Sequence, residues 1–285
     1  MTASKERFFD EIIKKNKIMK YKMLVVDMDD TLLTDDHEIS NENATMLLKA
    51  QEMGVYVVLA SGRPTSAMLN YAKELQCDIN NSFMISFNGS TITDLKEDKV
   101  LFEHSLTKEQ IHSIYDFSQE NNTHIITYLD GKIISESNSE YIDIESTITG
   151  LELVIVPSFK EAVTTSAVKC LLLEEPTYLK TVEPLLKVAM PDLSVCMSKP
   201  FFLEAAPYGV DKGAAVEILA KKLNIHPSEI IAVGNAGNDL TMVQYAGLGV
   251  WVDNVDDELR EFGDVIVASN NDHGVAEVVR RFILE

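Results

Sequence analysis

Residues 23–34 read MLVVDMDDTLLT, an apolar run followed at once by three acidic residues within four positions. The run predicts a buried β-strand, and alternation along its end would bring the Asp27 and Asp29 side chains to one side, with Met28 on the other. Two carboxylates that close repel each other unless a cation neutralises them. A hard divalent ion with oxygen ligands, Mg²⁺, fits such a pair. The competing interpretation is a strand end with a solvated acidic turn.

Further apolar runs occur on both sides of this stretch, and helical patterns separate them. The runs are VYVVLA (55–60), FMIS (83–86), IIAV (230–233), LGVWV (248–252) and VIVA (265–268). They are continuous rather than alternating, as expected for strands covered on both faces by helices. Helices are predicted between Ser40 and Gly54, where Ser40 is the N-cap, and over 210–225. This alternation predicts an α/β fold with a Rossmann-like parallel-sheet core.

The middle of the chain has a different pattern. In IITYLDGKIIS, Asp130 and Gly131 join two β-prone runs and predict a tight hairpin. VKCLLLEE (168–175) is typical of a strand and LKTVEPLLKVAM (179–190) of a helix. We therefore predict an inserted α+β domain at 90–196, a core formed by 19–89 and 197–285, and an N-terminal extension at 1–18.

Polar, glycine-containing turns follow several predicted strands. Ser61-Gly62-Arg63 follows the second run, Asn88 follows the third, and the sequence GNAGND (234–239) follows IIAV. Because the carboxyl ends of parallel strands form the usual ligand site of such sheets, we expect these turns to meet. The Ser61 hydroxyl and the Gly62 amide at a strand-to-helix turn could bind phosphate. SGRP on its own is also common as an ordinary turn.

Charged side chains in this pattern suit phosphoryl transfer. One carboxylate of the Asp27 and Asp29 pair could attack phosphorus, and the other could protonate the leaving oxygen and later activate water. Lys212, at the start of a predicted helix, could neutralise charge on the transferring group. A lysine near a helix start is more often simply solvated.

Composition limits the partners. The chain has 25 basic and 45 acidic residues, a formal charge of −20, which argues against nucleic-acid or anionic-membrane surfaces. No run reaches the roughly 20 apolar residues that span a bilayer. The three cysteines (Cys77, Cys170 and Cys196) are far apart and lack C-x-x-C spacing, which favours buried core thiols in a reducing cytoplasm. The sequence does not indicate an oligomeric state.

Taken together, DMDDTLL, ASGRP, FNGS, DKGAAVEIL and VGNAGNDLTM resemble, in order and spacing, the motifs of the haloacid dehalogenase (HAD) superfamily. The resemblance runs from about residue 20 to the C-terminus and is closest to the Cof-type phosphatase branch, which carries an α/β cap. It implies a HAD-like core with an inserted α+β cap, a Mg²⁺ cofactor and hydrolysis of small phosphate monoesters.

The resemblance also implies roles by position. Asp27 would be the nucleophile and Asp29 the acid/base. The implied phosphate or substrate contacts are Ser61, Gly62, Arg63, Asn88, Lys212 and Asn238. The implied metal site comprises Asp27, the Asp29 backbone carbonyl, Asn235 and Asp239, the last of which would orient metal-bound waters.

Two residues depart from the family pattern. Asp30 stands where the family usually has glycine; if the backbone there needs a positive φ, aspartate is among the less costly replacements. Asn235 stands where most members have a metal-binding aspartate, so one negative charge is missing. The sequence therefore supports a Mg²⁺-dependent phosphatase of sugar phosphates or phosphorylated cofactors. Its alternatives are a catalytically weakened phosphate- or metal-binding regulatory relative and a phosphomutase.

Overall fold

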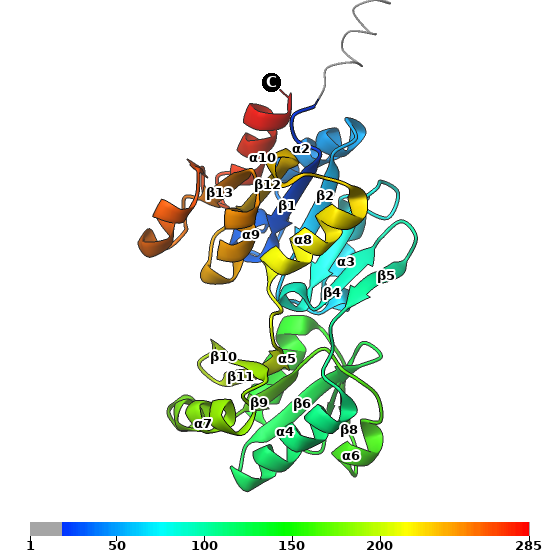
Figure 1. Cartoon of the computed structure of the whole chain (residues 1–285), viewed down its shortest axis with the longest axis vertical. Coiled ribbons are helices and arrows are strands. Elements are labelled where there is room, and N and C mark those ends of the chain that lie inside the picture. Colours follow the sequence, from blue (N-terminus) through cyan, green and yellow to red (C-terminus); the bar gives the residue numbers. More distant parts are fainter. Residues whose placement is uncertain (1–18, 285) are drawn as a thin grey trace, which may run out of the picture.

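The computed structural model describes residues 19–284, and the predicted N-terminal extension lies outside the described residues. Two β-sheets organise the chain, one above the other in Figure 1. The larger sheet has eight strands, in spatial order β14 (Val265–Val267), β13 (Leu248–Val252), β12 (Ile230–Gly234), β1 (Met23–Asp27), β2 (Tyr56–Ala60), β3 (Phe83–Ser86), β4 (Thr91–Asp94) and β5 (Lys99–Glu103). The first six are parallel, and β4 and β5 extend the sheet antiparallel.

Helices cover both faces of the large sheet, as the continuous apolar runs predict (Figure 1). Alternate residues of β1 serve the two faces: Leu24 and Val26 join one buried cluster, Met23 and Val25 the other. The helices on the first face are α2 (Asn41–Glu52), α3 (Thr65–Glu74) and α10 (Gly274–Val279), and those on the second are α8 (Lys212–Leu223) and α9 (Leu240–Tyr245). The predicted α/β fold is confirmed.

The predicted ends of α2 are also observed. The Ser40 side chain accepts a hydrogen bond from the Asn43 backbone N–H, which is the geometry of an N-cap. Gly54, just beyond the helix, has φ +91°, a conformation that other residues rarely adopt. Local sequence therefore sets both ends of this helix.

The smaller sheet has six strands and its own helices. In spatial order its strands are β10 (Leu193–Lys199), β11 (Phe202–Pro207), β9 (Cys170–Leu173), β6 (His124–Leu129), β7 (Lys132–Ser135) and β8 (Leu153–Ile155). Its helices are α4 (Lys108–Glu120), α5 (Glu140–Thr149), α6 (Phe159–Ala162) and α7 (Pro176–Ala189). β6 and β7 form the hairpin predicted at Asp130 and Gly131, both of which have positive φ.

The residues that form each sheet do not follow the predicted domain boundaries. β4 and β5 (91–103) belong to the large sheet, although they lie inside the predicted insertion at 90–196. Conversely, β11 pairs with β9 and β10 pairs with β11, so the small sheet extends to Pro207. The boundaries predicted at 90 and 196 thus differ from the points where the chain leaves and rejoins the large sheet. We call residues 104–207 the small-sheet part.

Helices α4 and α7 pack on one face of the small sheet, through a buried cluster that includes Ile125 and Leu203. The other face carries α5, which lies between the two parts in Figure 1. Phe87, which follows β3 of the large sheet, packs against this second cluster and lies 5.5 Å from the Tyr128 ring, centroid to centroid. Side chains from both parts therefore meet on this face.

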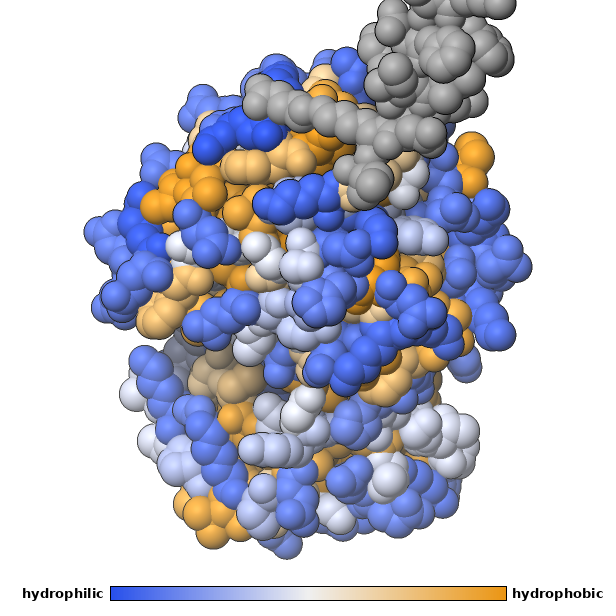
Figure 2. All heavy atoms as spheres, turned by 45° about the horizontal axis from the view of Figure 1, so that its top comes forward, coloured by the Kyte–Doolittle hydropathy of each residue, from blue (hydrophilic) through white to orange (hydrophobic). Residues whose placement is uncertain are grey.

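The polarity of the surface and the burial of the cysteines agree with the sequence-based expectations, except at Cys196. The face shown in Figure 2 is mostly hydrophilic, in keeping with the excess of acidic residues. No helix within 19–284 is long and apolar enough to cross a membrane. Cys77 and Cys170 are buried free thiols, as predicted, whereas Cys196 is exposed because it lies on β10, at the edge of the small sheet.

A close approach at Gly89 gives a stability prediction. Gly89 has φ +109°, and a Cβ there would overlap the backbone carbonyl of Asp211. Gly89→Ala is expected to lower the free energy of unfolding by about 3–5 kcal/mol, because strain and a clash with immobile backbone add together.

Gly131→Ala is the matched control: its φ is also positive, at +72°, but nothing lies within 4 Å of the added Cβ. About 1–2 kcal/mol is expected there. Urea denaturation of both variants measures the difference, and equal losses would contradict the role of the Asp211 contact.

Candidate active site

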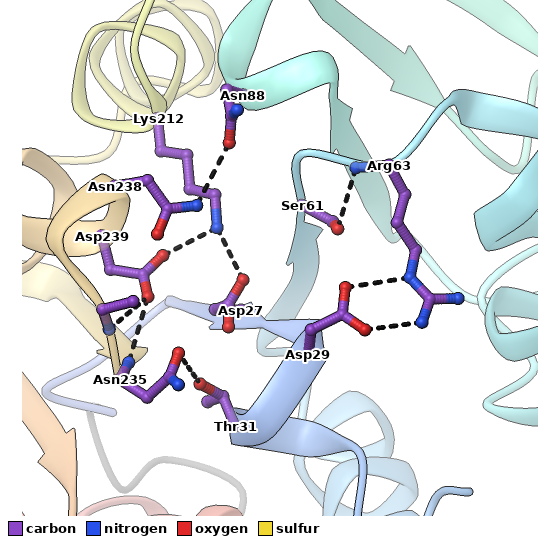
Figure 3. Close-up of polar contacts among 11 residues, drawn as sticks. Asp27, Asp29, Thr31, Ser61, Arg63, Asn88, Lys212, Asn235, Asn238 and Asp239 are labelled. Atoms are coloured by element: carbon purple, nitrogen blue, oxygen red, sulfur yellow. Dashed lines mark hydrogen bonds and ion pairs between the residues drawn. The ribbon is translucent and has the colours of Figure 1, made fainter. Parts of the chain in front are cut away.

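The predicted site residues lie together at the carboxyl ends of the central strands (Figure 3). The turns after β1, β2, β3 and β12 supply most of them, and α8 supplies Lys212. Eight line one cavity of about 740 Å³: Asp27, Asp29, Ser61, Gly62, Arg63, Asn88, Asn235 and Asn238. Lys212 and Asp239, both fully buried, lie next to Asp27, with the lysine amine between the two carboxylates (Figure 3). The cavity reaches the small-sheet part, which forms its other wall.

Lys212 is held between two carboxylates. Its Nζ donates to Oδ1 of Asp27 at 2.6 Å and to Oδ1 of Asp239 at 2.7 Å. The side chain is 0% exposed, so the alternative of a solvated lysine is wrong. Asp239 also accepts the backbone N–H groups of Asn235 and Ala236 through Oδ2, at 3.0 and 3.1 Å. Asp239 therefore fixes both the lysine and the turn after β12.

Asp27 carries negative charge that its surroundings compensate incompletely. Its side chain is 7% exposed. Burial, and then repulsion by Asp239, raise its pKa from 3.8 to about 7, although the ion pair with Lys212 lowers it. Burial acts to lower the pKa of Lys212, but Asp239 and Asp27 outweigh it and raise that pKa. The three side chains have a formal charge of −1, so an additional cation at Asp27 would be favoured electrostatically.

Asp29 points to Arg63 rather than to the buried lysine (Figure 3). The guanidinium donates from Nε to Oδ2 at 2.9 Å and from Nη2 to Oδ1 at 2.5 Å, a bidentate pair. The next residue, Asp30, has φ 56° and ψ 16°, the left-handed conformation. A positive φ is thus required where the family usually has glycine, and aspartate tolerates it.

The turns after β2 and β3 contact each other closely. The Ser61 Oγ accepts the Arg63 backbone N–H at 3.1 Å, and the Asn88 N–H donates to the Ser61 carbonyl at 3.0 Å. A Cβ at Gly62 would lie 3.1 Å from the Asn88 amide, a very tight approach. Asn238 donates from Nδ2 to the Asn88 side-chain oxygen at 3.2 Å. Hydroxyl, amide and backbone donors thus surround one end of the cavity.

Sequence reasoning missed one residue of this constellation. Thr31, fully buried, donates from Oγ1 to Oδ1 of Asn235 at 3.2 Å. Its position in the same turn as Asp27 and Asp29 is the sequence feature that could have identified it as a site residue. The contact orients the Asn235 amide, with its oxygen toward Thr31 and the turn after β1 (Figure 3).

The oxygen donors suit a Mg²⁺ ion with few protein ligands. Among the described residues no group of three or more His, Cys, Asp or Glu side chains is arranged to hold a metal. Both Asp239 oxygens accept protein hydrogen bonds, and Asp29 is paired with Arg63. One Asp27 oxygen accepts from Lys212, which leaves the other, and the Asn235 amide oxygen has a second lone pair beside its bond from Thr31. Mg²⁺ commonly takes one or two carboxylates plus waters and substrate phosphate. The uncompensated charge on Asp27 agrees with this fit.

Comparisons with known proteins agree with this geometry. Residues 24–279 match the family model of the haloacid dehalogenase-like hydrolases. The chain is 30% identical to 5-amino-6-(5-phospho-D-ribitylamino)uracil phosphatase YcsE of Bacillus subtilis, covering 92% of this chain and 96% of that protein.

Solved structures agree as well. A haloacid dehalogenase-like hydrolase from Bacteroides thetaiotaomicron superposes with a TM-score of 0.88 at 32% identity, over 92% of this chain and 99% of that one. A structure from Thermotoga maritima gives 0.85 at 30% identity, over 93% and 100%. The resemblance read from the motifs is confirmed, and the chain belongs to the haloacid dehalogenase-like hydrolase family.

Proposed function

We propose that this protein is a Mg²⁺-dependent phosphatase that removes phosphate from small phosphorylated metabolites through an intermediate on Asp27. The observation that carries the proposal is the Asp27 carboxylate, held by Lys212 at 2.6 Å where the cavity meets β1. Membership of a hydrolase family and similarity to a protein named as a phosphatase support it.

In the first step an Asp27 carboxylate oxygen attacks phosphorus. A bond from Asp27 to phosphorus forms, and the bond from phosphorus to the ester oxygen breaks. Asp29 gives its proton to the departing oxygen, so the alcohol leaves neutral. In the second step Asp29 takes a proton from water, whose oxygen forms a bond to phosphorus while the bond from phosphorus to Asp27 breaks. Inorganic phosphate is released and the Asp27 carboxylate is restored.

Arg63 connects substrate binding with the acid/base. Its guanidinium occupies both oxygens of Asp29 and lines the same cavity. A phosphate ester that binds Arg63 would compete for these donors and free Asp29 to reach the leaving oxygen. The donors at Ser61, Gly62 and Asn88 would hold the remaining phosphate oxygens.

Mg²⁺ would be held by the Asp27 carboxylate, the Asn235 amide oxygen and the Asp29 backbone carbonyl. When bound it would supply positive charge that neutralises the phosphate and keeps Asp27 ionised. Asp239 would act indirectly, because its carboxylate positions Lys212 and the backbone of Asn235. The small-sheet part would act as the cap that selects the leaving group.

Asn235→Asp tests the metal assignment. The added carboxylate is expected to lower the Mg²⁺ concentration at half-maximal activity by about 10- to 100-fold, because a charged ligand replaces a neutral one. Asn238→Asp is the matched control, since it adds the same charge to the same turn but points to Asn88. Mg²⁺ titrations of phosphate release compare the two, and equal shifts would indicate a general charge effect instead of ligation.

Phosphate release from a panel of sugar phosphates and phosphorylated cofactors, at rising Mg²⁺, tests the function itself. Turnover that depends on Mg²⁺ is expected. A second candidate, a regulatory relative with weakened catalysis, is favoured by the amide at Asn235. Turnover by Asn235→Asp alone would support that candidate. An isomerised product in place of free phosphate would indicate a phosphomutase.

A further inference from the structure

The turn after β1, which carries Asp29, is held from outside by three asparagine side chains. One comes from the first turn of α2, one from the loop after β13 and one from the loop after β14. Each donates from its side-chain nitrogen to a different backbone carbonyl of the turn. The pairs are Asn254 with Asp30 at 2.7 Å, Asn43 with Leu32 at 3.3 Å and Asn270 with Leu33 at 3.1 Å. The chain that follows Asp29 is therefore fixed at three closely spaced points.

Two of these amides are themselves oriented by backbone donors. Asn254 Oδ1 accepts the N–H of Asn270 at 3.1 Å, and Asn43 Oδ1 accepts the N–H of Ala276 at 2.9 Å. Because the oxygen of each amide accepts such a bond, its nitrogen faces the turn, where only a donor can meet a carbonyl. Asn270 therefore sets the direction in which Asn254 donates.

Asn254 contacts the peptide unit next to the proposed acid/base. The Asp30 carbonyl belongs to the peptide between Asp30 and Thr31. Here the backbone changes from the extended conformation of Asp29 (φ −67°, ψ 129°) to the left-handed conformation of Asp30 (φ 56°, ψ 16°). Residues other than glycine seldom adopt the latter, so a hydrogen bond that fixes the Asp30 carbonyl helps to maintain it. The direction in which the Asp29 side chain leaves the backbone depends on this change of conformation.

In the proposed mechanism the Asp29 side chain moves, whereas its backbone has to stay in place. Arg63 donates to both carboxylate oxygens, so Asp29 has to leave this pair before it can give a proton to the leaving oxygen. A proton donor must lie within hydrogen-bond distance of its acceptor. A misplacement of about 1 Å can lower the rate about 100-fold. A backbone held by groups other than Arg63 keeps the reach of Asp29 constant when the pair opens.

Exposure separates Asn254 from the other two asparagines. Asn43 and Asn270 are 0% and 2% exposed, so their loss would leave buried carbonyls without a donor and would lower stability. Asn254 is exposed, so water can replace its hydrogen bond to the Asp30 carbonyl. A mobile water does not fix the direction of the peptide. An Asn254 variant therefore changes the geometry of the turn with little effect on folding.

We propose that Asn254, oriented by Asn270, is a positioning residue for the acid/base step: it holds the backbone at Asp29 and Asp30 so that the Asp29 carboxyl reaches the leaving oxygen. This inference rests on the proposed phosphatase function. Asn254 does not line the cavity, so it acts on the reaction through Asp29 and not through the substrate. Its loss should therefore matter most where the leaving group needs a proton.

The test compares Asn254→Ala with the unmodified protein on two esters of similar size, phenyl phosphate and p-nitrophenyl phosphate, at saturating Mg²⁺. The quantity measured is kcat/KM, which reports the steps up to release of the leaving group. The p-nitrophenolate anion leaves readily, whereas phenol needs a proton. For phenyl phosphate kcat/KM is expected to fall about 10- to 100-fold, and for p-nitrophenyl phosphate about 3-fold or less. Equal losses on both esters would overturn the inference.

Two further variants show whether the effect passes through Asp29. Asn80→Ala removes the same kind of bond, from a side-chain amide to the Gln76 carbonyl at 3.0 Å, in a loop before β3 that does not line the cavity. Its kcat/KM values should equal those of the unmodified protein. When Asn254→Ala is added to Asp29→Ala, kcat/KM for phenyl phosphate should fall about 2-fold or less, because the acid is already absent. A second full loss there would show that Asn254 acts by another route and would overturn the inference.

Failure of the proposed function gives a different result. If the unmodified protein turns over neither ester, the catalytic proposal fails, and hydrogen exchange then decides whether Asn254 holds the turn. The Leu33 N–H closes this turn by donating to the Met28 carbonyl at 2.9 Å. Asn254→Ala is expected to speed exchange of this amide about 10-fold, whereas Asn80→Ala should leave it unchanged. Unchanged exchange in Asn254→Ala overturns the inference.

Discussion

Asp27→Asn is expected to abolish phosphate release and, at the same time, to raise the thermal stability of the protein above pH 7. The loss of activity, by about 10⁴-fold or more, follows because an amide oxygen is a far weaker nucleophile than a carboxylate. The gain in stability follows because Asp27 is buried in a group of three side chains with one excess negative charge.

The pH dependence of this gain has a definite sign. The pKa of Asp27 is 3.8 in the unfolded chain and about 7 in the folded one, so between these values the folded state binds more protons. Stability from this group is therefore lost as the pH rises from about 4 to 7, and the full penalty applies above 7. The Asn variant has no such penalty. The gap between the two proteins should grow over this range and then level off.

The size of the gain is bounded by the pKa shift. At about 1.4 kcal/mol per unit the shift corresponds to at most about 4 kcal/mol, and weaker interaction of Asn with Lys212 reduces it. About 1–3 kcal/mol, or roughly 5 °C in Tm, is expected. Thermal unfolding at pH 5 and pH 8 in a metal chelator measures it, since bound Mg²⁺ would stabilise only the unmodified protein.

Asp30→Asn is the control for removing one acid from the same turn. Asparagine tolerates the left-handed conformation of residue 30, and Asp30 makes no side-chain contact with Lys212. Turnover and its pH dependence should persist in this variant. Substantial activity in Asp27→Asn would contradict its role as nucleophile, and a lower Tm at pH 8 would contradict the electrostatic description of the site.

The sequence predicts the main features of this site because they depend on local pattern. Each central strand is a short apolar run, and the parallel arrangement brings the turns after these runs to one edge. The sequence alone therefore predicts that four residues lie close together: Asp27, Ser61, Asn88 and Asn235. The ends of α2 and the hairpin at 130–131 follow from cap and turn residues in the same way.

Features that depend on long-range partners could not be predicted. β4 and β5 form a hairpin whose residues do not reveal which sheet they extend, because an edge strand is chosen by tertiary contacts. The pair between Arg63 and Asp29 joins residues 34 positions apart, and the contact between Thr31 and Asn235 spans 204. Each requires the completed sheet.

The burial of Lys212 between two carboxylates also depends on long-range partners, and it makes the protein sensitive to loss of this cation. Lys212→Met would leave Asp27 and Asp239 buried together without a cation. The free energy of unfolding at pH 8 is expected to fall by about 3–5 kcal/mol, and turnover is expected to be lost. The loss should be smaller at pH 5, because one carboxylate can then take up a proton and relieve the repulsion.

Two further variants separate charge from packing. Asp239→Asn combined with Lys212→Met removes one of the two unpaired carboxylates, so stability should recover by about 2 kcal/mol while turnover stays lost. Lys221→Met, on the same helix but 71% exposed and paired with Glu217, should change stability by about 0.5 kcal/mol or less. Urea denaturation at both pH values measures all three. If Lys212→Met costs no more than Lys221→Met, the buried lysine does not neutralise the site. If the loss of stability is the same in the double variant, it would instead come from lost packing, because the Lys212 side chain also fills space at the start of α8.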